Sequence, residues 1–87
     1  MARRERSKGF GARLKRLRLS MGFTTQLAFA DRAGVPYQTY RQWEIFDAAP
    51  SATTLVRALK ALGVAERDGV LIWIATGDPP APKWLEE

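Results

Sequence analysis

Hydrophobic side chains recur at helical spacing over the first quarter of the chain. One stripe has residues at i, i+4, i+7 and i+11, namely Phe10, Leu14, Leu17 and Met21. Residues at these intervals share one face of an α-helix, and most of the basic residues between them fall off that face. The pattern predicts a helix from about residue 9 to residue 21.

A glycine and two threonines separate this helix from a second, shorter one. Gly22 suits the left-handed conformation that ends a helix, and either Thr24 or Thr25 supplies the oxygen that caps the next one. The second helix then starts at Thr25 and is stopped by Gly34. Its apolar positions are Leu27, Phe29, Ala30 and Ala33.

The third segment, from Pro36 to about Phe46, has a narrow apolar edge and a broad polar face. The fixed φ of proline suits a first helical position, and Tyr40 and Trp43 at i and i+3 supply the edge that packs on the core. The 3.6-residue period places the polar side chains on the opposite, exposed side. They are Tyr37, Gln38, Arg41 and Gln42.

Two further segments complete the pattern. The fourth helix has Ser51 as its N-cap and ends at Gly63. Its buried stripe comprises Leu55, Val56, Leu59 and Leu62. The fifth segment, from Glu66 to Thr76, is apolar all the way round; its β-branched residues leave a strand open, but its length and the Gly77 stop favour a helix.

The pattern therefore predicts one all-α domain of five helices. Residues 10–77 form this domain, residues 1–9 a basic N-terminal arm, and residues 78–87 a proline-rich tail anchored only by Trp84 and Leu85. A chain of 87 residues buries only about 60% of the surface that it exposes when unfolded. We expect a single core of modest size.

Composition excludes most catalytic and metal chemistry. The chain has no cysteine and no histidine, which removes the usual ligands of transition metals and the commonest general base. We therefore expect no enzyme, no metal site and no cofactor. The most apolar run, residues 70–75, is far shorter than the roughly 20 residues of a membrane span.

Positive charge is concentrated at one end of the chain. The formal net charge is +5, and the first twenty residues hold eight basic residues against one acidic residue, a net of +7. Such a block indicates a polyanion as partner, and charge alone leaves DNA, RNA and a membrane surface open.

Two short helices joined by a glycine turn, the second with a polar outer face, form a helix-turn-helix, whose second helix enters the DNA major groove. Glutamine bonds two ways to adenine N6 and N7, and arginine to guanine O6 and N7. Each good pair is worth roughly 1 to 3 kcal/mol of discrimination. The third segment carries both residue types on its exposed face, so double-stranded DNA is the polyanion that fits best.

Four linked motifs resemble those of the Cro and phage-repressor type of helix-turn-helix proteins, also called the xenobiotic-response-element family. They are LKRLRLSMG, TQLAFADRAGV, PYQTYRQWE and PSATTLVRALKALGV. The resemblance covers residues 11–63 and implies a compact five-helix, lambda-repressor-like domain with the helix-turn-helix at its second and third helices. It also implies a sequence-specific DNA-binding transcriptional regulator.

Site residues follow from this resemblance position by position. Gln26 matches a residue that grips a phosphate and packs beside the reading helix. Arg18 and Glu44 match a pair that is ion-paired across the first and third helices, with the arginine also facing the DNA backbone. The base-reading set is Tyr37, Gln38, Thr39, Arg41 and Gln42, of which Thr39 and Arg41 lie at the groove wall.

Three features depart from the family's pattern. Val35-Pro36 replaces the usual serine or threonine cap, so a cap worth about 1 kcal/mol is expected to be missing. The GFTTQ turn is one residue longer than usual. After Glu44 the family commonly has Asn-Gly and basic residues that hold phosphates, whereas here Asp47 would repel the DNA backbone. We therefore expect phosphate contacts from the arm and from three further residues: Arg3, Arg4, Arg6, Lys8, Arg18, Gln26 and Pro36.

The surplus apolar surface of the fifth segment predicts a homodimer. Helix-turn-helix proteins generally pair so that two reading helices meet major-groove faces roughly 34 Å apart. The expected interface comprises Val70, Leu71, Trp73, Ile74, Trp84 and Leu85. The alternative is that the tail folds back and covers the surplus itself.

These expectations combine into a dimeric repressor that occupies an inverted-repeat operator, in the cytoplasm and associated with the nucleoid. No membrane partner is expected. A second class remains open: an antitoxin-like DNA-binding protein whose C-terminal segment also binds a small protein partner.

Overall fold

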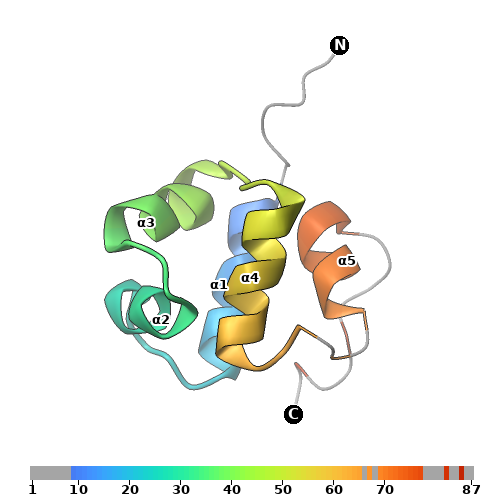
Figure 1. Cartoon of the computed structure of the whole chain (residues 1–87), viewed down its shortest axis with the longest axis horizontal. Helices are drawn as coiled ribbons and strands as arrows, with labels where there is room; N and C mark the ends of the chain where they lie inside the picture. Colours follow the sequence, from blue (N-terminus) through green and yellow to red (C-terminus); the bar gives the residue numbers. More distant parts are fainter. Residues whose placement is uncertain (1–8, 66, 68, 78–81, 83–84, 86–87) are drawn as a thin grey trace.

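The structure is a computed structural model of the chain and describes residues 9–65, 67, 69–77, 82 and 85. These residues form five helices and no strand, which confirms the predicted all-α fold and decides the fifth segment in favour of a helix (Figure 1). The helices are α1 (Phe10–Ser20), α2 (Gln26–Ala33), α3 (Tyr37–Phe46), α4 (Ala52–Leu62) and α5 (Val70–Thr76).

Helices α1 and α4 form the middle of the domain, with α2 and α3 on one side and α5 on the other (Figure 1). Helix α1 packs against α3 and α5, α2 packs against α3 and α4, and α4 also contacts α5. Every helix contributes to one core, whose largest fully buried side chains are Tyr40, Phe10, Phe29, Leu17, Leu59, Ile74 and Val70.

The helix ends follow the predicted caps closely. Of the two candidate threonines, Thr25 is the cap of α2: its hydroxyl accepts a hydrogen bond from the Ala28 amide at 3.2 Å. Ser51 is the cap of α4, and its hydroxyl accepts a hydrogen bond from the Thr54 amide. Pro36 lies just outside α3 rather than at its first position, and α3 has no side-chain cap, as the Val35-Pro36 sequence predicts.

The start of α1 and the end of α3 meet at an unusually close contact. Gly11 lies directly against α3, and its amide donates a hydrogen bond of 2.7 Å to Asp47 Oδ1. Asp47 ends α3 in the left-handed region, with φ of 57°. Its carboxylate thereby satisfies one of the free amides at the start of α1, where negative charge is also favourable. Asp47, read from sequence as a repulsive charge, has a structural task.

Two predicted details of the helices are wrong. Leu27 is 61% exposed rather than buried. It lies two positions before Phe29, which is roughly 200° around the helix, so the two cannot share a buried face. Helix α5 begins at Val70 rather than near residue 66, because Gly69 adopts a left-handed conformation directly before it.

The predicted dimer interface also needs correction. Val70, Trp73 and Ile74 are buried in the core of this same chain, and so is Leu85 from the tail. Five helices together with a returning Leu85 provide more apolar cover than the sequence indicated. Leu71 is only partly buried against the core, Ile72 is 57% exposed, and Trp84 lies outside the described residues.

None of the described helices has both the length and the apolar character needed to cross a membrane.

Candidate nucleic-acid interface

The helix-turn-helix is built from α2, a tight turn and α3. Gly34 ends α2 with φ of 74°, and the next amide, that of Val35, returns to the Ala30 carbonyl. Phe29 of α2 and Tyr40 of α3 then meet edge to face, with ring centroids 5.3 Å apart. Such aromatic pairs stabilise beyond the area they bury, so the angle between the two helices is held by a buried contact.

The outer face of α3 carries the predicted base-reading side chains. Tyr40 and Trp43 are buried against the core, and Glu44 is turned inward toward α1. All five predicted reading residues are exposed: Tyr37, Gln38, Thr39, Arg41 and Gln42. The structure therefore brings donors and acceptors together on one helix at the edge of the domain (Figure 1).

A buried ion pair ties this helix to α1. Arg18 Nε lies 3.1 Å from Glu44 Oε2, and Arg18 Nη2 donates to Glu44 Oε1, also at 3.1 Å. The two side chains are only 6% and 5% exposed. This two-pronged contact is the geometry in which a guanidinium fork best matches a carboxylate, and it confirms the predicted pairing.

Glu44 is the acceptor at the centre of a larger network. The Gln26 side-chain amide at the start of α2 donates to Oε1 at 2.9 Å, and the Tyr40 hydroxyl donates to Oε2. Arg18 also donates to the Phe23 carbonyl in the turn before α2. Donors from three helices thus converge on one carboxylate, which fixes how α3 is rotated about its own axis.

The network shifts the pKa values of its members. Burial alone would raise the pKa of Glu44, but hydrogen bonds from Arg18, Gln26 and Tyr40 and the charge of Arg18 lower it below its ordinary value. Burial and the hydrogen bond to Glu44 raise the pKa of the Tyr40 hydroxyl. Burial alone would lower the pKa of Arg18, but the hydrogen bond to Glu44 and the charge of Glu44 outweigh this effect, so the pKa of Arg18 is raised.

We expect the lowered pKa of Glu44 to make the fold sensitive to acid. The unfolded chain, with Glu44 at its ordinary pKa of 4.5, binds this proton more readily than the folded protein. The resulting stability is complete above that pH and is lost as pH falls toward the lower folded pKa. Urea unfolding between pH 7 and pH 3 measures the loss, with Glu44→Gln as control. Identical pH dependence in both proteins would contradict this assignment.

The burial of Arg18 argues against its predicted contact with the DNA backbone. Its guanidinium is engaged by Glu44 and Phe23 and is almost fully covered, so we withdraw the phosphate role and keep the structural one. Gln26 remains partly exposed beside α3, and Pro36 is exposed at the start of α3. The arm residues of the predicted set, Arg3, Arg4, Arg6 and Lys8, lie outside the described residues.

Two other basic residues of α1 also have intramolecular contacts. Arg13 Nε donates to the Ile74 carbonyl near the end of α5 at 3.0 Å. The Arg16 guanidinium lies 5.8 Å from the centre of the Trp73 ring, within the range of a cation–π contact. Part of the basic block read from the sequence therefore attaches α5 to α1.

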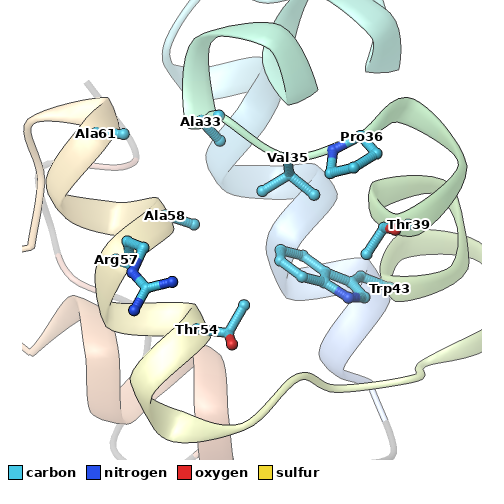
Figure 2. A pocket seen from close by; sticks show the side chains of 10 residues that line it. Ala33, Val35, Pro36, Thr39, Trp43, Thr54, Arg57, Ala58 and Ala61 are labelled. Carbon is cyan, nitrogen blue, oxygen red and sulfur yellow. The ribbon is translucent and has the colours of Figure 1, made fainter.

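A cavity of about 310 Å³ lies beside the start of α3, between the helix-turn-helix and α4. Val35, Pro36 and Trp43 form one wall, and Thr54 and Arg57 of α4 form the other (Figure 2). The cavity is open because the side chains that face it from α2 and α4 include three alanines, Ala33, Ala58 and Ala61. No local sequence pattern predicts this cavity, because its walls come from separate helices that meet only in the folded protein.

One residue outside the predicted base-reading set, Ile45, also lies on the exposed side of α3. It lies on α3 three residues after Gln42 and is 48% exposed. The spacing from Gln38 and Gln42, applied one step further along the helix, is the signal that would have found it.

Within the described part of the chain, no group of three or more acidic, histidine or cysteine side chains is placed to hold a metal ion.

Comparison with known proteins agrees with the architecture. A family model described as helix-turn-helix matches residues 14–68, a range that begins within α1 and includes all of α2, α3 and α4. Comparisons with curated proteins and with solved structures gave no match. Because the matched segment covers more than half of the chain, the protein belongs to the Cro and phage-repressor type of helix-turn-helix family, whose members are DNA-binding transcription regulators.

Proposed function

We propose that the protein is a repressor that reads an operator with α3 and blocks a promoter by occupying it. One observation carries the proposal: Gln38, Arg41 and Gln42 are exposed on the face of α3 opposite Tyr40 and Trp43. The Glu44 network and the aromatic contact to α2 hold that face in one orientation. Preorganised side chains lose little entropy when they bind base edges.

Base reading by the two glutamines has a direct test. Gln38→Ala and Gln42→Ala should each relax sequence preference at one position of the site. The free-energy difference between the preferred base pair and the others at that position should fall by about 1 to 3 kcal/mol. The measurement is binding to a set of duplexes that vary one base pair at a time. Thr53→Ala, exposed at the start of α4, is the control. An unchanged preferred sequence in both glutamine variants would refute the assignment of α3 as the reading helix.

The operator itself is found by selecting bound duplexes from a random pool, followed by binding of the selected duplex at two salt concentrations. A regulator of the proposed kind enriches a defined sequence and keeps its preference as salt rises. Binding of all duplexes alike, lost with salt, would instead mean that only charge is recognised.

We further propose that the protein acts as a homodimer through the surface around Ile72. Its support is an apolar groove of about 300 Å³ beside α5, with Phe10, Pro50, Leu71 and Ile72 among its lining residues. Exposed apolar surface of this kind is typical of subunit contacts. An inverted repeat in the selected duplexes would indicate a two-fold pair, whereas a single half-site would contradict the dimer.

The antitoxin-like alternative has less support. It needs a C-terminal segment available to a protein partner, whereas Leu85, one of the two anchors in that segment, is packed into the core of this chain. Co-purification with a second small protein would favour it.

A further inference from the structure

The exposed side of α3 is not uniformly polar. Gln38, Gln42 and Ile45 are spaced at i, i+4 and i+7 along the helix, which places them on one stripe. All three are exposed, and the buried Tyr40 and Trp43 lie on the other side. The stripe that carries both glutamines therefore ends in an isoleucine side chain.

Among the described residues, no core contact accounts for an isoleucine at this position. Ile45 does not belong to the core, nor to the partly buried residues packed against it. A β-branched residue is a poorer helix former than the polar residues common at exposed helix positions. The family pattern commonly has asparagine here, so the apolar side chain is a feature of this chain.

The major groove has one apolar feature on its base edges, the 5-methyl group of thymine. Along an α-helix, Ile45 lies about 4.5 Å beyond Gln42 and about 10.5 Å beyond Gln38. Successive base pairs rise by about 3.4 Å, so the isoleucine is within reach of a base pair one or two steps from that of Gln42. Its branched side chain has the chemistry to cover a methyl group.

We infer that Ile45 is a specificity-determining residue that packs on the 5-methyl group of a thymine next to the base pair contacted by Gln42. The inference rests on the proposed function, in which α3 lies in the major groove. It adds to that function a preference based on an apolar contact rather than on hydrogen bonds.

The test uses the selected duplex, with each thymine replaced in turn by deoxyuridine, which removes only the methyl group. Full-length wild-type protein should lose about fourfold in affinity at one position of each half-site, the value expected for one buried methyl group. Ile45→Ala should lose that discrimination and bind both duplexes equally. Alanine is a strong helix former, so this variant keeps α3 intact. Ile45→Val should retain most of the discrimination.

Leu19→Ala is the matched control, because Leu19 is also an apolar side chain that is about half exposed, at 50%, and it lies on α1. Its ratio of thymine to uracil affinity should equal that of wild type, even if overall affinity changes. Comparing the ratio of thymine to uracil affinity in wild type with the same ratio in Ile45→Ala isolates the contact between Ile45 and the methyl group. A wild-type scan with no sensitive thymine, or an equal methyl effect in Ile45→Ala, would overturn the inference and leave the proposed function standing. Failure to select any sequence would overturn both.

Discussion

Replacing Glu44 with alanine is expected to destabilise the protein by about 3 to 5 kcal/mol, the cost of breaking one partner out of a buried ion pair. The substitution leaves the Arg18 guanidinium buried with the Phe23 carbonyl as its remaining hydrogen-bond partner among the contacts described above. It also removes the acceptor of Gln26 and Tyr40. Since small domains are stable by only about 5 to 15 kcal/mol, the loss removes a large share of the total. Urea unfolding followed by circular dichroism measures it.

Two variants separate the buried charge from a general effect of mutating α3. Arg41→Ala changes an exposed charge on the same helix and should alter stability by no more than about 0.5 kcal/mol. Removing both charges, as Arg18→Leu with Glu44→Leu, should cost less than Glu44→Ala alone because no charge is stranded. If Glu44→Ala cost less than about 1 kcal/mol, the pair would be solvated in the native protein and its proposed role in orienting α3 would fail.

Among substitutions that add a single methyl group, Gly11→Ala is expected to lower the stability of the fold the most. A Cβ at this position would lie 2.0 Å from the Glu44 carbonyl oxygen and 2.8 Å from Asp47 Oδ1. The nearest atoms belong to backbone and cannot rotate away, so α1 and α3 must separate. Overpacking typically costs about 1 to 3 kcal/mol and occasionally more, and we expect the upper end of this range because the Gly11–Asp47 hydrogen bond is also lost. A fall in Tm measures the effect.

Gly22→Ala distinguishes crowding from the usual cost of replacing glycine. Gly22 has φ of 87° and no atom within 4 Å of an added Cβ. Its replacement carries only the strain of a left-handed conformation, roughly 1 to 2 kcal/mol. Gly11 lies within α1 and has no positive φ, so its cost is entirely one of contact. Equal losses in the two variants would show that α1 and α3 are further apart in solution.

Much of the fold could be predicted because its signals are local. Helices α1 to α4 each carry a periodic apolar pattern, and Thr25, Gly34, Ser51 and Gly63 occupy cap positions that depend only on their neighbours in the chain. The exposed face of α3 followed from two aromatic residues at i and i+3. Helix ends were right to within about a residue where a cap was recognised. The start of α5 was missed because Gly69 was not recognised as its boundary.

The candidate site could be predicted only in part. The Arg18–Glu44 pair came from the family resemblance, and the structure confirms it. The same resemblance gave Arg18 a phosphate contact that its burial argues against, because exposure depends on everything packed around a side chain. Ile45, which we infer to contact a thymine, lies outside the predicted set because an apolar residue at the end of a polar face is usually assigned to packing.

Local sequence patterns were enough to place α1 to α4, to identify Tyr40 and Trp43 as core residues and to predict which side chains α3 presents to solvent. Helix packing sets the role of each charge: Arg13 donates to the Ile74 carbonyl, Asp47 accepts from the Gly11 amide at the start of α1, and Glu44 accepts from Arg18 and Gln26 on two other helices. Helix packing also buries Val70, Trp73, Ile74 and Leu85 within one chain. The physical reason is distance along the chain. Helical periodicity repeats every few residues and is visible in a short window, whereas these contacts join residues 18 to 61 positions apart and exist only once the helices have packed.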